Sequence, residues 1–409
     1  MQHVMIGHQA SYAAEHDVPR GNLSDLYPRW LGARELLLHH RDPYSAEITR
    51  EIQEGYYGRA INPTRPYDPT DWQGFAYPVY VSFVLAPTIT LPFATVQAVF
   101  RWLLIALTAA SVPLWFRILR WRTSMGTVAS GVILVLGSFQ AIQGVKLQQL
   151  SLLVSGLIAF TALLLTEGNF LAAGVLLAIA TIKPQLALPL AAWLLLWALS
   201  DWKSRKNYVW GFAGAVAALV LGGELVLPGW IGRFWHALIE YRRYNNGAES
   251  SLELIFGPTA GKLLTVAVVV GLAIICWRCR HVSTDAPQFR WMFALLMATT
   301  VVIVPKEAPY NQVLLVPSIL LILEQAGLLW RRGVAARLSL TIAGFIVIWP
   351  WLASLAIVIA SPFCSPSVLL RLWTLPLYTT LAIPLAVFAV TTMTFRQLSL
   401  RQGAVGSHG

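Results

Sequence analysis

Asp25 is the acidic residue whose surroundings best suit proton transfer. It stands in the run Ser24-Asp25-Leu26-Tyr27, directly before a predicted helix. A carboxylate at a membrane surface can take the proton of a hydroxyl nucleophile, which makes Asp25 a candidate catalytic base. The alternative is structural, because Asp is also a common helix N-cap. Asp42 is a second acidic candidate, but Pro43 follows it, and an Asp-Pro pair usually starts a turn.

Basic residues at the ends of apolar runs are candidate ligands for a phosphate. Three are lysines: Lys146, Lys183 and Lys306. A charge near hydrocarbon is costly, so each lysine either extends to the interface or pairs with a lipid phosphate at that depth. Lys183 is the best of them, because Pro184 breaks the helix there and frees backbone groups. Arg242 and Arg243 add a basic pair, whose alternative interpretation is a solvated loop balanced by nearby glutamates.

Several kinds of site are missing from the sequence. We find no HExxH, no His/Cys ligand spacing and no EF-hand loop, and therefore expect no metal. Neither GxGxxG nor a P-loop occurs, so we expect no nucleotide cofactor and no ATP-driven pump. The three cysteines are too few for a disulfide framework.

The elements that position these residues are membrane helices. Of the 409 residues, 56% are apolar and 12% are charged, whereas soluble domains have about 25% charged residues. This composition excludes a soluble globular protein, a disordered chain and a nucleic-acid binder. We predict an all-α, polytopic transmembrane bundle of about eleven spans. The apolar runs are 94–116, 127–143, 148–166, 170–183, 185–200, 208–227, 259–277, 291–305, 311–330, 338–360 and 372–394. Several are short for a full crossing, which predicts broken or tilted helices.

The distribution of charge predicts the topology. Five short basic loops are separated by even numbers of runs and therefore share one face, which the positive-inside rule makes cytoplasmic. They are Arg117–Arg122, Lys203–Lys206, Arg278–Arg290, Arg331–Arg337 and Arg396–Arg401. Residues 1–76, with ten acidic residues and seven arginines, then face the other side with the loop 228–258. Residues 77–394 form the bundle and 395–409 a cytoplasmic tail. Either a first transmembrane helix precedes Met1, or the first crossing helix translocates this segment directly.

The outer segment is predicted to contain two surface helices. Residues 24–40 form one, capped by Ser24 or Asp25, with Pro28 in its first turn. Residues 45–57 form the other, capped by Ser45, with glutamates on a solvated face. Residues 59–74 are a loop, and 77–92 a re-entrant or juxtamembrane helix. Such helices lie on the membrane surface, where they would cover the mouth of the bundle.

The order of motifs over residues 22–190 resembles glycosyltransferase family 87, membrane sugar transferases of the GT-C class. The resemblance is carried by Ser24-Asp25-Leu26-Tyr27, Ala33-Arg34-Glu35-Leu36-Leu37, Arg41-Asp42-Pro43-Tyr44, Phe75-Ala76-Tyr77-Pro78 and Leu85-Ala86-Pro87. Leu147-Gln148-Gln149-Leu150 resembles the family's glutamine-bearing turn, with Gln149 the better match, and Ala180-Thr181-Ile182-Lys183-Pro184 its lysine-proline turn. Two positions depart from the pattern: Arg41 replaces a glycine and Val79 a proline.

The resemblance implies an inverting transfer of a sugar from a polyprenyl-phosphate donor to a lipid or glycan acceptor. Mannose is one candidate sugar, and the place is the outer face of a bacterial inner membrane. Asp25 matches the family's catalytic acid. The phosphate ligands would come from Lys183, Arg243, Lys306 and Lys146, and further candidates are Asp42, Tyr44 and Gln149. The partners are then the donor, the acceptor and membrane lipids, with no nucleic acid. A polytopic transporter or lipid flippase is the alternative, because it could also use intramembrane charges.

Overall fold

The structure is a computed structural model that describes residues 11, 14–15, 21–62, 64–65, 68, 71–244, 249–305, 308–372 and 374–405. Over these residues the chain forms α-helices, short 3-10 helices and turns, without a β-strand. The predicted all-α class is therefore confirmed. Lys306, one of the candidate phosphate ligands, lies outside the described residues.

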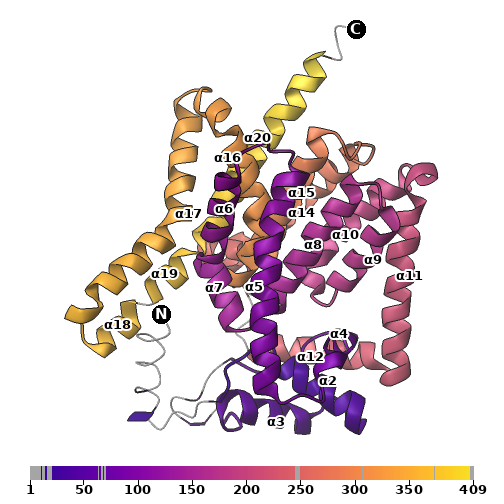
Figure 1. Cartoon of the computed structure of the whole chain (residues 1–409), viewed down its shortest axis with the longest axis vertical. Coiled ribbons are helices and arrows are strands. Elements are labelled where there is room, and N and C mark those ends of the chain that lie inside the picture. The colour runs from indigo at the N-terminus through magenta and orange to yellow at the C-terminus, as the bar shows by residue number, and fades with distance from the viewer. Residues whose placement is uncertain are drawn as a thin grey trace.

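A group of short helices leads into a bundle of longer ones (Figure 1). The short helices are α2 (Tyr27–His39), α3 (Ala46–Tyr57), α4 (Val81–Leu85) and the 3-10 helix η2 (Ala86–Thr88). The first half of the bundle consists of α5 (Phe93–Ile118), α6 (Met125–Leu136), α7 (Phe139–Lys146), α8 (Leu150–Thr166), α9 (Phe170–Ala180), α10 (Pro184–Leu199) and α11 (Trp202–Val226). The rest comprises α12 (Trp230–Tyr244), α13 (Ser251–Phe256), α14 (Pro258–Arg278), α15 (Pro287–Ile303), η3 (Pro309–Leu315), α16 (Val316–Trp330), α17 (Val334–Ala360), η4 (Ser361–Phe363), α18 (Pro366–Leu372), α19 (Thr374–Thr379) and α20 (Ala382–Val405).

Helix length and hydropathy make this chain a multi-pass membrane protein. Among the described residues, six helical segments are long and apolar enough to cross a membrane, and α6 with α7, bent by 55°, would make a seventh. Four shorter apolar helices, α8, α9, α10 and α15, accompany them. Each of the eleven predicted apolar runs corresponds to one of these elements. The prediction of broken helices is confirmed at the α6–α7 bend, where Gly137 and Ser138 interrupt the helix.

Aromatic side chains fill the centre of the bundle between α10 and α15. Trp193 and Trp197 of α10 are almost completely buried, as are Phe289 and Phe293 of α15. The rings of Trp193 and Phe293 meet edge to face with centroids 5.7 Å apart. Such pairs hold two short helices together by large buried apolar surfaces. This packing fixes α10, whose first turn follows Lys183.

Helices occur at both predicted places, as α2 and α3, and eight of the 13 residues of α2 are buried. Ser45 caps α3 by accepting a hydrogen bond from the backbone N of Ile48 at 3.2 Å, and Pro28 lies in the first turn of α2. The predicted cap of α2 is wrong. Leu26 occupies the N-cap position, and its side chain makes no capping hydrogen bond. Ser24 and Asp25 do not cap the helix, because their side chains bind glutamines of the α7–α8 turn.

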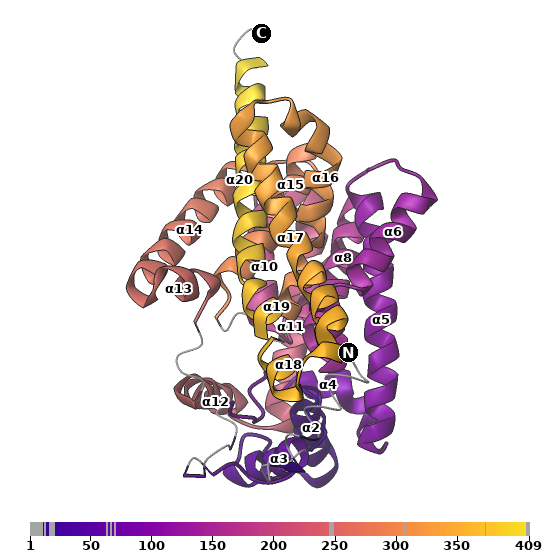
Figure 2. The same cartoon turned by 90° about the vertical axis from the view of Figure 1, so that its left-hand side faces the viewer.

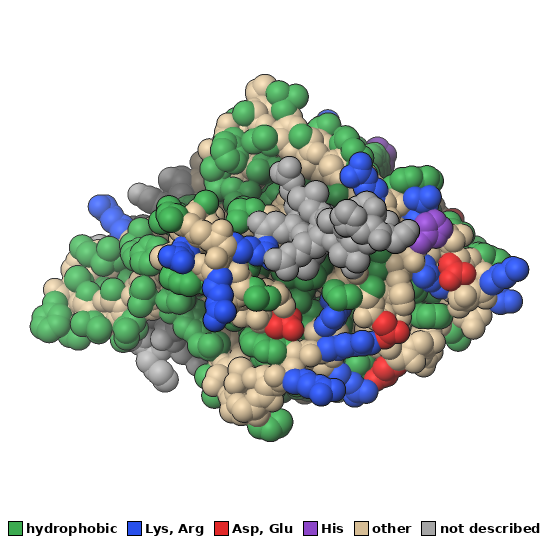
Figure 3. All heavy atoms as spheres, turned by 90° about the horizontal axis from the view of Figure 1, so that it is seen from above, with side chains coloured by type: hydrophobic (Ala, Val, Ile, Leu, Met, Phe, Trp, Pro, Cys, Tyr) green, Lys and Arg blue, Asp and Glu red, His purple; other side chains and the backbone are tan. Residues whose placement is uncertain are grey.

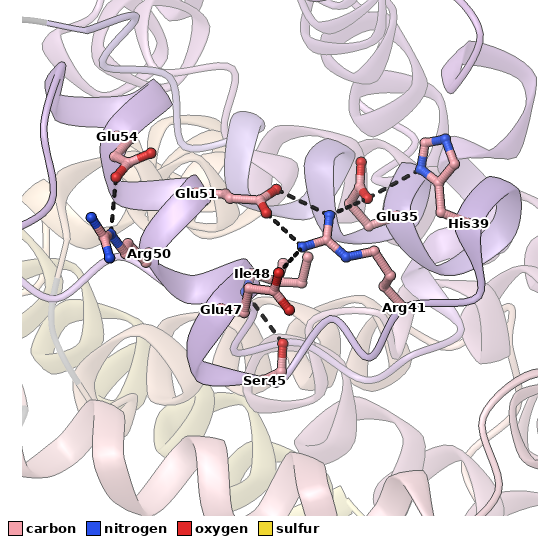
Figure 4. Close-up of polar contacts among 9 residues, drawn as sticks. All are labelled: Glu35, His39, Arg41, Ser45, Glu47, Ile48, Arg50, Glu51 and Glu54. Atoms are coloured by element: carbon pink, nitrogen blue, oxygen red, sulfur yellow. Dashed lines mark hydrogen bonds and ion pairs between the residues drawn. The ribbon is translucent and has the colours of Figure 1, made fainter.

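Arg41 joins the two surface helices to each other (Figure 4). Its guanidinium contacts Glu35 of α2 at 2.7 Å, and Glu47 and Glu51 of α3 at 2.9 and 2.5 Å. The α3 carboxylates are on the exposed side of the helix, as the sequence predicts, so each pair by itself stabilises little. A single side chain that meets three carboxylates nevertheless forms a network of charges that bridges α2 and α3.

The two ends of the bundle differ in character. The helices α2, α3 and α12 lie at one end, and the C-terminal part of α20 lies at the other (Figures 1 and 2). Three basic connections meet at the C-terminal end, where Arg120 pairs with Asp285, Arg290 donates to the carbonyl of Leu119, and Arg205 donates to that of Val282 at 3.3 Å. Figure 3 shows Lys and Arg side chains spread over this end.

The backbones of helices α9 and α11 approach each other closely. A Cβ at Gly211 would lie 2.2 Å from the carbonyl oxygen of Leu171, and one at Gly174 would lie 2.4 Å from that of Tyr208. Small residues allow such contact between membrane helices. We therefore expect Gly211→Ala to lower the free energy of unfolding by about 1–3 kcal/mol, measured as a lower Tm in detergent.

Gly214 of α11 provides the matched control, because a Cβ there would meet no atom within 4 Å. Gly214→Ala should keep the wild-type Tm or raise it slightly, since Ala is the better helix former. Equal Tm values for both variants would contradict the packing argument.

Candidate active site

A cavity of about 620 Å³ lies between the bundle and the surface helices. Its walls come from the turn before α2, from α3, from the turns that precede α8 and α10, from α12 and from η3. Three basic and two acidic side chains line it: Arg29, Lys183, Arg242, Asp25 and Asp71. Segments distant in the sequence therefore bring ionisable groups to one place.

Asp25 reaches the cavity because two tight turns bind each other. Leu23 and Gln148 both have a positive φ of 50°, a conformation that non-glycine residues seldom adopt. Across the two turns, the backbone N of Asp25 donates to the carbonyl of Leu147 at 2.9 Å, and Ser24 Oγ donates to Gln148 Oε1 at 2.7 Å. The turn before α2 is thereby fixed against the start of α8.

The Asp25 carboxylate accepts one side-chain hydrogen bond on each oxygen. Tyr56 Oη donates to Oδ1 at 2.9 Å, and Gln149 Nε2 donates to Oδ2. Burial, together with the neighbouring Asp25 carboxylate, raises the pKa of Tyr56 far above its ordinary value, so Tyr56 remains a donor. The two bonds fix the orientation of the carboxylate.

Gln149 connects Asp25 to Lys183. Lys183 Nζ donates to Gln149 Oε1 at 2.9 Å, so the Gln149 amide has its oxygen toward the lysine and its nitrogen toward the carboxylate. Lys183 also donates to Ser151 Oγ, which in turn donates to Asn311 Oδ1 at 2.8 Å. Lys183 is 5% exposed, and it forms no ion pair within the described part of the chain. The ammonium is therefore held by neutral groups.

Arg29, which sequence reasoning did not select, is a second buried cation at this cavity. Its Nη1 donates to the carbonyl oxygen of Asp25 at 2.7 Å, and its guanidinium lies over the ring of Tyr77, 4.3 Å from the centroid. Tyr56 and Asn311 were not selected either. Tyr56 has the spacing expected for the apolar face of a helix, and this spacing does not indicate a polar contact. Asn311 had one signal, since Asn311 and Gln312 are adjacent polar residues at the start of the apolar run 311–330.

Four other predicted site residues do not line this cavity. Lys146 and Arg243 are exposed, and neither is among the described residues that line the cavity. Arg242, next to Arg243, does line it. Asp42 starts a turn, as one interpretation predicted: it accepts from the backbone N of Tyr44 at 2.9 Å and pairs with Arg233 of α12. Tyr44 Oη donates to the carbonyl of Tyr77 at 2.7 Å. These contacts join the surface helices to the bundle.

One side of the cavity is apolar and open. Leu188 of α10, and Trp235 and Ile239 of α12, line the cavity and are 51%, 64% and 37% exposed. Apolar side chains that are exposed at the rim of a cavity suit an apolar ligand or a lipid surface. Within the described residues, no group of three or more His, Cys, Asp or Glu side chains could hold a metal ion.

The comparison with known families places these residues in context. The sequence model of glycosyltransferase family 87 matches residues 75–305, more than half of the chain. The chain belongs to glycosyltransferase family 87. It is therefore an enzyme, and family membership favours the transferase over the transporter or flippase alternative. Gln149 and Lys183 lie inside the matched residues of this family 87 glycosyltransferase, whereas Asp25, Arg29 and Tyr56 precede them. No curated protein and no solved structure matches the chain.

Proposed function

We propose that this family 87 enzyme transfers a sugar from a polyprenyl-phosphate donor to a hydroxyl of a lipid or glycan acceptor, with inversion at the anomeric carbon. The observation that carries the proposal is the hydrogen-bonded chain Asp25–Gln149–Lys183, in which a carboxylate and an ammonium line the same cavity. A base and a phosphate ligand held in a fixed relation are what such a transfer requires.

In the proposed reaction, the acceptor oxygen attacks the anomeric carbon as the bond from that carbon to the phosphate oxygen breaks. Asp25 takes the proton of the attacking hydroxyl. The bonding electron pair goes to the phosphate oxygen, so the leaving lipid phosphate gains negative charge. Lys183, 5% exposed and bound to neutral groups, stabilises that charge. Gln149 and Tyr56 hold the base in place.

The shape of the cavity supports a lipid-linked donor. Its charged part contains Lys183 and Arg29, and its open rim is formed by apolar side chains of α10 and α12. A ligand with an anionic head and an isoprenoid chain satisfies both parts. A water-soluble nucleotide sugar would leave the apolar rim uncovered. Mannose is the sugar that the family resemblance favours.

The proposal is tested by the transfer of radiolabelled sugar to a membrane lipid extract by the purified enzyme. A polyprenyl-phosphate sugar should support transfer, and the matching nucleotide sugar should not. Transfer from the nucleotide sugar alone would contradict the proposed donor.

The proposed location of the reaction is the outer face of the bacterial inner membrane. All eleven apolar segments would cross the membrane, with α2, α3 and α12 outside and the basic connections inside. The interconnected basic loops at the C-terminal end support this orientation. The four shorter apolar helices, α8, α9, α10 and α15, would cross where the bilayer is locally thinner.

We expect a cysteine at Ala46, which is exposed on α3, to react with an impermeant thiol reagent in intact cells. The background for this variant is a chain without Cys276, Cys279 and Cys364. Ser204, exposed in the first turn of α11 among basic residues, provides the opposite control, since Ser204→Cys should react only after the membrane is opened. The reverse pattern would contradict the orientation.

A further inference from the structure

Arg29 is buried beside the cavity and has no role in the reaction proposed above. The side chain is 9% exposed and lies on α2, one turn beyond Asp25. It contacts the carbonyl oxygen of Asp25 and the face of Tyr77. Neither contact carries a full negative charge, so the guanidinium is not neutralised by them.

Part of the hydrogen-bonding capacity of Arg29 is unused. Its Nε is buried and has no hydrogen-bond partner, and Arg29 forms no ion pair with the described residues. A guanidinium has five N–H donors, and leaving one buried without an acceptor is costly. An anion in the cavity that Arg29 lines would balance the charge of this guanidinium.

The charges that line the cavity also favour an anionic ligand. Arg29, Lys183 and Arg242 exceed the two carboxylates, Asp25 and Asp71, by one positive charge. Two buried cations that share a cavity repel each other in a medium of low dielectric constant. A phosphate between them would convert that repulsion into attraction.

We propose that Arg29 is a second ligand of the donor phosphate and acts with Lys183 on the leaving group. This inference rests on the proposed function. The donor phosphodiester has one negative charge, and the lipid phosphate that leaves has about −1.5 to −2 at neutral pH. Lys183 balances the first charge and Arg29 the second. A planar guanidinium offers two parallel donors that match two phosphate oxygens, a fixed fork geometry that the ammonium of lysine lacks.

The same side chain would couple phosphate binding to the position of the base. Arg29 Nη1 is 2.7 Å from the carbonyl oxygen of Asp25. A phosphate that binds the Arg29 guanidinium therefore orients the group that holds the backbone of the base. Arg29 would then affect both donor affinity and the rate of transfer.

Binding of geranyl phosphate, a short isoprenoid phosphate, to the detergent-solubilised full chain tests this inference by titration calorimetry. We expect Arg29→Gln to weaken binding about 10- to 100-fold, the loss typical of a hydrogen bond to a charged group. Arg29→Lys should give an intermediate loss, because it keeps the charge without the planar fork. The neutral alcohol geraniol should bind wild type and variants alike.

Arg233, exposed on α12 and paired with Asp42, provides the matched control. Arg233→Gln should bind geranyl phosphate as wild type does. If Arg29→Gln does not unfold cooperatively on heating, the variant is misfolded, and the affinity of Arg29→Lys for geranyl phosphate tests the proposal instead. Unchanged affinity for geranyl phosphate in the folded Arg29 variants, with a loss in Lys183→Ala, would overturn the role of Arg29 only. Failure of wild type to bind geranyl phosphate would overturn the proposed donor as well.

Discussion

Asp25→Asn is expected to lower the rate of sugar transfer about 10²–10⁴-fold, the usual contribution of a general base. Asn cannot take a proton at neutral pH, but it preserves the local contacts. Its carbonyl oxygen can accept from Gln149, and its amide can donate to the hydroxyl of Tyr56, which bind the two carboxylate oxygens in the native enzyme. Folding and expression should therefore remain near wild type. The measurement is the transfer of radiolabelled sugar from a polyprenyl-phosphate donor.

Asp42→Asn provides the control for this variant. Asp42 accepts from the backbone N of Tyr44 in a turn that Asn also favours, so the transfer rate should stay close to wild type. Full activity in Asp25→Asn together with a loss in Asp42→Asn would reverse the two roles. Full activity in both would mean that the base is elsewhere.

Lys183→Ala is expected to weaken donor binding by at least 10-fold, and more than Lys183→Arg does. The Ala variant removes the ammonium and leaves Gln149 and Ser151 without their shared donor. A lost hydrogen bond to a charged group accounts for about 10- to 100-fold in affinity. The Arg variant retains the charge, which matters more than shape at a lipid head group. Titration of wild type and of both variants with the donor phosphate measures this difference in affinity.

Two further variants separate charge from packing at this position. Lys183→Met fills similar space without the charge and should resemble Lys183→Ala in donor affinity. Lys203→Ala removes an exposed lysine at the start of α11, in one of the basic connections, and should have no effect. Equal donor affinity for wild type and Lys183→Ala would leave Lys183 as a structural residue.

The membrane elements could be predicted from sequence because each depends on its own residues. Runs of apolar residues define spans without reference to their neighbours, and each predicted run corresponds to a helix or a bent pair. The start of α3 follows from Ser45, whose hydroxyl caps the helix locally. The start of α2 does not, because Ser24 and Asp25 use their side chains on partners 124 residues away.

The candidate site shows the same division between local and long-range information. Asp25, Gln149 and Lys183 each stand in a recognisable motif. The hydrogen bonds that join them depend on how the turns before α8 and α10 pack against the turn before α2. Tyr56 has the spacing of an apolar helix face, and only the tertiary fold turns its hydroxyl toward Asp25. For adjacent residues such as Arg242 and Arg243, the helical rotation decides which of the two lines the cavity.

The central claim, that one cavity holds the base and the donor phosphate, is tested most directly by a cryo-EM map of Asp25→Asn with an intact polyprenyl-phosphate sugar. Slow turnover in this variant would preserve the donor during grid preparation. We predict that the phosphate lies within hydrogen-bonding distance of Lys183 Nζ, about 3 Å, with the sugar between Lys183 and position 25 and the isoprenoid chain over Leu188 and Trp235. A donor phosphate bound elsewhere, with this cavity empty, would contradict the account.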